Sequence, residues 1–395
     1  MKVLILGMDG YIGWSLALHQ LERGNTVCGI DDFSRRKNVE EIGSWSAIPV
    51  LPMKKRMEIL KKEYGDKISF YEGDLVNTEF TNDIIKNFQP DGIVHLAEQP
   101  SAPYSMIDQD HSIYTQKNNV IGTLNVVYAI KSHAPKAHLV KLGTMGEYGT
   151  PDLDIPEGFF DIEFRGRKAT IPFPRFAGSW YHWSKVHDSN NIMFACKLWG
   201  LKSTDIMQGV VYGTRINEIT DESRHTRFDF DEIFGTAINR FCAQAVINHP
   251  LTVYGKGGQT RGFLALEDSI QCISLLLDRP AEMGEYRVVN QFDEEYKVSE
   301  LAARVKRIGN KKGLDVNIEN IENPRLEKEE HHYKADHEKL KSLGFKPTRH
   351  IDEQIDVMLE DLYTYKDRII EKKEAIVQSL QWQGKHVVQP YIHQT

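Results

Sequence analysis

The order of motifs in the first 32 residues restricts the fold of this chain more than any other feature. The run KVLILG starts at Lys2, is almost entirely apolar and ends in a glycine, which is typical of a buried strand in a parallel sheet. The segment MDGYIG follows, and then WSLALHQLERG, whose apolar residues recur with a helical period. A second strand-like run, TVCGID, comes next. This order of strand, turn, helix and strand predicts an α/β fold with a parallel sheet.

The turn between the first strand and the helix carries three glycines, Gly7, Gly10 and Gly13, in a G-x-x-G-x-x-G spacing. Glycine in such a turn lets the backbone approach a pyrophosphate closely while the helix N-terminus points at the phosphates. Three glycines can also serve a tight turn alone, and the spacing by itself does not decide between the two. We expect these glycines, with Tyr11 and Ile12 between them, to contact a dinucleotide.

Two acidic residues close the second strand. Asp31 and Asp32 lie about 20 residues beyond the glycines, where a carboxylate can accept hydrogen bonds from a ribose. Ser34, Arg35 and Arg36 follow, and the two arginines could instead hold the 2′-phosphate of NADP. Because Asp31 would repel that phosphate, we expect NAD as the cofactor.

Strands and helices continue to alternate after this point. The runs ISFYEGDL, DGIVHLA and HLVKLGT read as strands, and VIGTLNVVYAI reads as an apolar helix. The alternation predicts a Rossmann-like, doubly wound parallel sheet. Further cofactor contacts are expected at its strand ends and on one helix, from Asp74, Leu75, Leu96 and Asn118.

A tyrosine and a lysine form the candidate catalytic pair. Tyr181 and Lys185, in WYHWSK, are four positions apart and lie on one face of a helix. An ammonium beside a phenol favours the phenolate, so Lys185 is predicted to lower the pKa of Tyr181 from about 10 towards neutrality. The phenolate could then take a proton from a substrate hydroxyl, and Thr144 could hydrogen-bond the same hydroxyl. A Tyr-x-x-x-Lys pattern is usually structural, but here it follows a dinucleotide motif.

Composition narrows the class of protein. The chain has 395 residues, 41% hydrophobic and 27% charged, with a net charge of -7, so neither a nucleic-acid partner nor membrane insertion is expected. No stretch reads as a signal, transit or membrane-spanning segment, and we expect a cytoplasmic protein. The four cysteines are widely separated and predict neither a disulfide framework nor a metal site: Cys28, Cys196, Cys242 and Cys272.

Longer stretches carry a resemblance to the extended short-chain dehydrogenase/reductase family. The glycine turn and Tyr-x-x-x-Lys specify only that superfamily. The stretches TMGEYGTP and NPRLEKEEHHY are more specific and are similar to the UDP-sulfoquinovose synthase group within it, as are SAPYSMIDQD, YHWSKVHDSNNI and HPLTVYGKGGQTRGFL. The likeness runs from Met1 to about residue 348.

The resemblance implies an NAD-dependent enzyme that makes UDP-sulfoquinovose from UDP-glucose and sulfite, and that forms a homodimer. It implies a mainly NAD-binding part over residues 1–205 and a smaller, mainly UDP-sugar-binding part over 206–348, with interleaved segments. Residues 349–395 are expected to form a helical tail. The residues that match the substrate side of the family are Thr144, Gln208, Thr236, Ala237, Asn239, Thr252, Val253, Tyr254, Gln259, Arg261, Asn323 and Arg325.

The segment TMGEYG raises a question about proton transfer. Related dehydratases carry an Asp-Glu pair after the threonine, where this chain has Met145 and Gly146. Our hypothesis is that Glu147 moves protons at C5 and C6 of the sugar, and that a second carboxylate is absent because it would repel sulfite. The alternative is that Glu147 only braces a loop. His182 could donate to sulfite or to water, or merely line the wall.

One position departs from the resemblance. Pro100 stands where the family pattern implies an arginine, and proline can neither donate a hydrogen bond nor hold an anion. Another cation, His182 or a lysine, is expected to replace it.

Rival activities that share the fold, NAD and the Tyr-Lys pair are a UDP-glucose 4-epimerase and a nucleotide-sugar 4,6-dehydratase. A non-catalytic dinucleotide-binding protein commonly lacks the tyrosine or lysine, and this chain has both.

Overall fold

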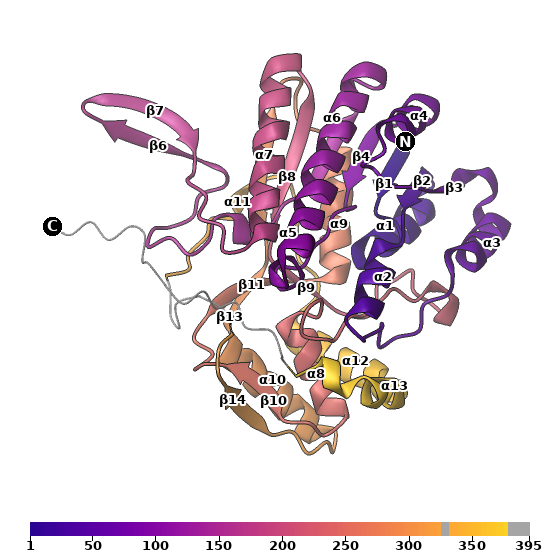
Figure 1. Cartoon of the computed structure of the whole chain (residues 1–395), viewed down its shortest axis with the longest axis vertical. Coiled ribbons are helices and arrows are strands. Elements are labelled where there is room, and N and C mark those ends of the chain that lie inside the picture. Colours follow the sequence, from indigo (N-terminus) through magenta and orange to yellow (C-terminus); the bar gives the residue numbers. More distant parts are fainter. Residues whose placement is uncertain (325–331, 378–395) are drawn as a thin grey trace.

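A computed structural model describes residues 1–324 and 332–377. Its centre is a seven-stranded sheet in which every neighbouring pair is parallel (Figure 1). The predicted doubly wound parallel sheet is therefore confirmed. In spatial order the strands are β12 (Tyr286–Gln291), β8 (Lys202–Gln208), β5 (His138–Leu142), β4 (Gly92–His95), β1 (Lys2–Leu6), β2 (Thr26–Asp31) and β3 (Ile68–Glu72).

The strands read as unbroken apolar runs because both faces of the sheet are covered. Side chains alternate along β1, so Val3 and Ile5 pack with α1 and α9 on one face. Leu4 and Leu6 pack with α4, α6 and α7 on the other face. The covering helices are α1 (Tyr11–Glu22), α3 (Met53–Tyr64), α9 (Leu266–Asp278), α4 (Thr78–Phe88), α5 (Gln109–Gln116), α6 (Gly122–His133) and α7 (Trp180–Trp199).

The strand order reverses direction between β1 and β4. The chain winds outward from β1 to β2 and β3, and then returns to β4 on the other side of β1. In open α/β sheets a ligand binds in the crevice that such a reversal leaves at the carboxyl ends of the strands. The loop after β1 and the loop after β4 therefore border the expected cofactor site.

A smaller second core lies at the carboxyl end of the sheet. It is built from helices α8, α10 and α12, two short sheets and helix α13 (Figure 1). These elements are α8 (Ala237–Val246), α10 (Val298–Lys311), α12 (Ile351–Thr364), α13 (Lys366–Glu371), β9 (Val210–Tyr212), β10 (Leu251–Tyr254), β11 (Thr260–Ala265), β13 (Glu294–Lys297) and β14 (Ile318–Ile321).

Segments from different parts of the sequence interleave between the two cores. β12 and α9 come after residue 206 and yet belong to the seven-stranded sheet and its cover. Helix α2 (Ser34–Glu41) and the following loop lie near the second core, where the Arg368 side chain donates to the Ser46 and Ala47 carbonyls. The exact domain limits given above stay a prediction.

Two short segments connect β5 to α7. Thr144 caps a single 3-10 turn, η4 (Met145–Glu147), and a hairpin of β6 (Phe159–Phe164) and β7 (Arg167–Pro172) follows before α7. The hairpin extends away from the body of the molecule beside α7 (Figure 1). Its base packs on a small apolar cluster that includes Met145, Tyr148 and Phe173.

Candidate active site

One large cavity of about 730 Å³ lies between the two cores. The loops after β1, β2, β4 and β5 line it from the sheet side, together with the start of α7. The start of α8 and the strands β9 and β11 line it from the smaller core. A dinucleotide could lie along the sheet side and a second ligand against the smaller core, because the cavity is continuous between them.

Close backbone packing requires glycine at two positions of the turn after β1. Gly7 has φ +87°, a left-handed conformation, and a Cβ there would lie 2.7 Å from the backbone carbon of Leu96. A Cβ on Gly13 would lie 2.1 Å from the carbonyl oxygen of Gly7. The turn therefore packs directly between the end of β4 and the start of α1, and its three glycines line the cavity.

The start of α1 has the features of an anion site. Gly10 is the N-cap residue of α1. Among the described residues, no side chain caps this helix and none in its first turn is acidic. Uncapped amides at a helix N-terminus attract phosphate through hydrogen bonds and through the helix dipole. Together with Tyr11, Ile12 and Gly13, which line the cavity, this arrangement fits the pyrophosphate of a dinucleotide.

Asp31 and Asp32 reach the cavity at the end of β2. The Asp31 carboxylate accepts hydrogen bonds from the amides of Asp9 and Phe33, each at 2.8 Å. Burial, and then the nearby charge of Asp9, raise the pKa of Asp31 to about 7. A ligand hydroxyl that hydrogen-bonds Asp31 would stabilise its ionised form, so this position suits the ribose of NAD.

The two arginines predicted beside these acids are held by carboxylates. Arg36 pairs with Asp9 at 2.5 and 2.7 Å and does not line the cavity. Arg35 lines the cavity, but it pairs with Asp229 at 2.7 Å and stacks on a phenylalanine ring. A 2′-phosphate would have to break these pairs, which agrees with a site for NAD rather than NADP. The other predicted cofactor residues all line the cavity: Ser34, Asp74, Leu75, Leu96 and Asn118.

The predicted catalytic residues Thr144, Tyr181 and Lys185 come together at one end of the cavity. The Thr144 hydroxyl accepts from the amide of Gly146 at 3.1 Å and is hydrogen-bonded with Tyr181. Ser179 caps α7, which therefore begins just before Tyr181. The carboxyl end of β5 and the start of α7 thus supply two hydroxyls to the same point.

The prediction that Lys185 lowers the pKa of Tyr181 does not hold in this structure. The Lys185 ammonium forms an ion pair with Glu98, a residue that sequence reasoning did not single out. Burial, followed by the charge of Glu98, raises the pKa of Tyr181 above its usual value. Glu98 lies three residues beyond the last residue of the buried strand β4, and an acidic residue at that place is the signal that was missed.

His182 occupies the space that the Met145–Gly146 pair leaves. A Cβ on Gly146 would lie 2.3 Å from Nε2 of His182, so any side chain at position 146 would displace the imidazole. The Nδ1 atom of His182 lies 2.9 Å from the Ser179 hydroxyl, which orients the ring. His182 lines the cavity beside Tyr181, with ring centroids 4.9 Å apart.

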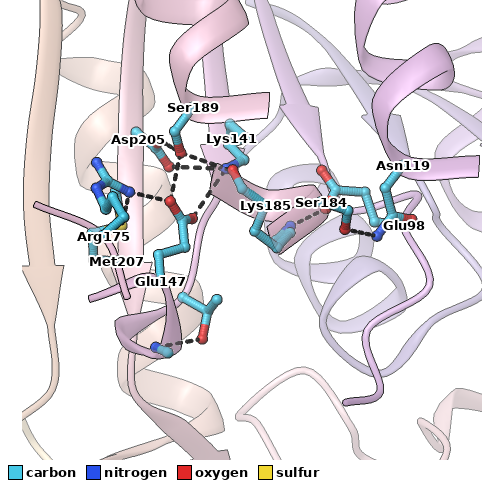
Figure 2. Close-up of polar contacts among 12 residues, drawn as sticks. Glu98, Asn119, Lys141, Glu147, Arg175, Ser184, Lys185, Ser189, Asp205 and Met207 are labelled. Carbon is cyan, nitrogen blue, oxygen red and sulfur yellow. Dashed lines mark hydrogen bonds and ion pairs between the residues drawn. The ribbon is translucent and has the colours of Figure 1, made fainter. Parts of the chain in front are cut away.

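Glu147 is placed differently from His182. Its side chain is fully buried and does not line the cavity within the described structure. It forms ion pairs with Lys141 and Arg175 and accepts from Ser189 (Figure 2). This environment favours the bracing alternative over direct contact with a sugar.

Most of the residues predicted for the substrate side line the cavity. Besides Thr144, these are Gln208, Thr236, Ala237, Asn239, Tyr254, Gln259 and Arg261. Thr252 instead bonds the side chain of Gln244, and Val253 lies in the second core, so both support the wall from behind. Asn323 does not line the cavity, and Arg325 lies outside the described residues.

Sequence reasoning missed three charged residues on this wall. Arg227 and Asp229 belong to the buried run TRFDFDEIFG and pair with each other at 2.8 Å. Arg240 lies one turn into α8 and bonds the Tyr254 hydroxyl at 2.5 Å. All three line the cavity. Charges that alternate with phenylalanines in TRFDFDEIFG are a signal that could have revealed Arg227 and Asp229.

Comparison with known proteins identifies the family. Residues 3–290 match the model of the NAD dependent epimerase/dehydratase family. The chain belongs to this family. Members of the epimerase/dehydratase family depend on NAD, in agreement with the glycine turn and the acids described above. Among the residues that the structure describes, no helix combines the length and apolar character needed to cross a membrane.

Two relatives within the epimerase/dehydratase family cover almost the whole chain. One is the UDP-sulfoquinovose synthase of Sulfolobus acidocaldarius, 50% identical over 98% of this chain and 99% of the relative. The other is the chloroplastic UDP-sulfoquinovose synthase of Spinacia oleracea, 49% identical over 96% of this chain and 79% of the relative. Among solved structures, a UDP-glucuronic acid 4-epimerase of Bacillus cereus has a TM-score of 0.70 at 20% identity, over 92% of this chain and 99% of that chain. It shares the fold.

Proposed function

We propose that the chain is a UDP-sulfoquinovose synthase, which joins UDP-glucose and sulfite to give UDP-6-sulfo-6-deoxyglucose and water. The observation that carries this proposal is the 50% identity to the Sulfolobus acidocaldarius synthase over nearly the full length of both chains. The cavity supports it, since a dinucleotide site, a Thr-Tyr-Lys group and an arginine-bearing wall meet in one space.

The substrate wall suits a nucleotide sugar. The start of α8 presents its first amides and Thr236, Ala237 and Asn239 to the cavity, and Arg240 and Arg261 lie beside them. Arginines and helix amides are the donors that a pyrophosphate prefers. We therefore place the UDP pyrophosphate against α8, with the hexose directed towards Tyr181.

The reaction begins with loss of the proton on the sugar 4-hydroxyl, which Tyr181 accepts while Thr144 holds the oxygen. Bound NAD supplies the hydride acceptor, and later the hydride donor, at C4. A 4-ketone makes the C5 proton acidic, so that proton leaves and the 6-hydroxyl departs as water after it gains a proton. The sulfur lone pair of hydrogen sulfite then adds to C6 of the resulting enone. The proton that hydrogen sulfite gives up is delivered to C5, because the original C5 proton has left with the water. Finally, Tyr181 returns its proton to O4.

We assign the proton transfers at C5 and C6 to His182 and not to Glu147. His182 lines the cavity beside Tyr181, whereas Glu147 is buried behind the wall. An imidazole can both accept the C5 proton and protonate the leaving hydroxyl near neutral pH. An imidazole also adds no negative charge where sulfite must approach. Pro100 lines the same cavity, but it does not supply the positive charge of the arginine that the family pattern implied there.

The test of the proposed function uses the purified protein with UDP-glucose and ³⁵S-labelled sulfite. We expect a labelled UDP-sugar whose mass corresponds to replacement of the 6-hydroxyl by a sulfonate, detected by chromatography and mass spectrometry. A product that is the same with and without sulfite would reject the proposal. UDP-galactose would then indicate a 4-epimerase, and a 4-keto-6-deoxy sugar a 4,6-dehydratase.

We also propose that the protein forms a homodimer through α5, α6 and α7. These helices lie side by side on the outside of the sheet (Figure 1). Their outer surface carries large apolar side chains at helical spacing, including Phe194 at 60% exposure and Leu198 at 54%. The other exposed apolar residues of these helices and their junction are Ile113, Ile121, Tyr128, Trp180 and Trp183. A second copy would bury this stripe.

The substitution Phe194→Glu is expected to weaken the dimer by about 10- to 100-fold, because it removes an apolar contact and buries a charge. Sedimentation velocity over a range of protein concentrations measures the change. The matched control is Phe164→Glu at the tip of the β6–β7 hairpin, where Phe164 is also exposed, and it should leave the mass unchanged. A wild-type monomer, or equal weakening by both variants, would contradict this interface.

We propose a reducing compartment such as the cytoplasm for the protein. Its four cysteines are free thiols buried in the core.

A further inference from the structure

A buried group of charged side chains lies behind the catalytic end of the cavity. Lys141 on β5 is completely buried, and so are Glu147 in η4 and Asp205 on β8. Arg175, which precedes α7, is nearly buried and pairs with Glu147 (Figure 2). Two cations and two carboxylates balance in charge, which a group removed from water requires.

Lys141 is the residue that connects this group to the catalytic helix. Its Nζ atom donates to the backbone carbonyl of Lys185 at 3.1 Å and to the Ser189 hydroxyl at 2.9 Å (Figure 2). The same Nζ lies 3.3 Å from Glu147 and 3.7 Å from Asp205. One ammonium therefore contacts α7, η4 and β8 at the same time.

The other members complete the connection. Ser189 lies 2.9 Å from Glu147 and 2.6 Å from Asp205 through its hydroxyl oxygen. The Tyr286 hydroxyl donates to Asp205 at 2.5 Å. Within the described chain, none of Lys141, Glu147 and Asp205 lines the cavity, so the group acts on the site from behind.

We propose that Lys141 is a positioning residue of the reaction: by joining the Lys185 backbone to Glu147, it holds Tyr181 of α7 in register with Thr144 of η4. This inference rests on the proposed function for its substrate, UDP-glucose, but not on sulfite. Thr144 precedes Glu147 by one short turn, and Tyr181 precedes Lys185 by one helical turn, so a shift between Glu147 and Lys185 becomes a shift between the two hydroxyls.

The charge of Lys141 also acts on the phenol. Burial, Glu98 and Glu147 raise the pKa of Tyr181, whereas Lys141 and the hydrogen bond with Thr144 lower it. The charged and titratable groups around Tyr181 are Glu98 behind β4, Lys141 on β5, Glu147 in η4, and His182, Lys185 and Asp188 on α7. Loss of Lys141 and loss of Glu147 should therefore move the titration of Tyr181 in opposite directions.

The test measures oxidation at C4 alone, as the rise in absorbance at 340 nm when NAD-loaded enzyme meets UDP-glucose without sulfite, between about pH 6 and 11, because the raised pKa of Tyr181 places the acid limb of the profile towards alkaline pH. We expect Lys141→Met to lower the maximal rate about 10- to 100-fold and to move the acid limb of the profile up by about one pH unit. KM for UDP-glucose should change less than about threefold, because Lys141 does not reach the cavity. Glu147→Gln should move the acid limb to lower pH.

Two further variants make the result decisive. Lys141→Met combined with Glu147→Gln removes one charge of each sign, so its acid limb should return close to that of the wild type while its rate stays low. Lys136→Met changes an exposed lysine before the same strand and should behave as wild type. If Lys141→Met does not fold, the charge-balanced double variant carries the test.

Several outcomes would overturn the inference. One is a wild-type rate in Lys141→Met or in the double variant. Another is an equal loss of rate at every pH in both single variants, which would mean a merely structural role. The proposed function fails separately, if the wild type reduces its NAD with UDP-glucose but never incorporates labelled sulfite.

Discussion

Replacement of Tyr181 by phenylalanine is expected to lower the rate of C4 oxidation by about three orders of magnitude. The substitution removes only the hydroxyl that we propose takes the substrate proton, and a positioned acid or base contributes about 10²- to 10⁴-fold. Thr144 remains, but a neutral hydroxyl cannot accept and keep that proton. NAD retention and UDP-glucose affinity should stay close to wild type, because the ring and its packing are unchanged.

The measurement for Tyr181→Phe is single-turnover NADH formation with UDP-glucose, followed by mass spectrometry of the product with sulfite. Tyr71→Phe on β3 is the matched control, since Tyr71 is exposed and lies on an outer strand of the sheet. A Tyr181→Phe rate within tenfold of wild type would remove Tyr181 from its assigned role and would leave Thr144 or His182 as the group to test next.

The second large effect is expected from Gly13→Ala. The new Cβ would lie 2.1 Å from the Gly7 carbonyl oxygen and 2.9 Å from Cα of Met8, so α1 must move away from the turn. Overpacking of this kind costs about 1–3 kcal/mol, which corresponds to a few degrees in Tm. The amides at the start of α1 would also leave their positions, and we expect NAD affinity to fall by about tenfold or more.

Two readouts follow Gly13→Ala: the NAD content of the purified protein after denaturation, and the thermal unfolding curve. Gly122→Ala is the control, because Gly122 also starts a helix and its Cβ would meet only Leu75, at 3.5 Å. If Gly13→Ala retains full NAD and an unchanged Tm, the close approach of α1 to Gly7 is not what shapes the cofactor turn.

Much of the candidate site could be predicted, for reasons that local motifs explain. Gly7, Gly10 and Gly13 are required wherever a strand turns tightly into a helix that faces phosphate. Tyr181 and Lys185 share a face because four residues make about one helical turn. Two of the differences concern groups that local sequence does not bring together. Arg36 pairs with Asp9, and Lys185 pairs with Glu98, through contacts made only in the folded chain.

Local sequence also did not determine where the Glu147 side chain lies. TMGEYG puts a carboxylate three residues after Thr144, and position alone suggested a role in proton transfer. The single turn of η4 directs that carboxylate away from the cavity towards Lys141, while Gly146 lets His182 approach from α7. Which of the two side chains faces the cavity depends on how η4 packs against a helix that starts 33 residues later.

The sequence by itself determined the parallel α/β sheet, the glycine turn, the candidate Thr-Tyr-Lys set and the family, because each depends on residue types at short, fixed spacings. The tertiary structure alone decided which charges meet: Glu98 with Lys185, Asp9 with Arg36, and Lys141 with Glu147 and the backbone of α7. Those partners are 6 to 87 residues apart and come from different strands and helices. The strength of a buried charge pair depends on distance and on exclusion of water, and both arise only when the elements pack.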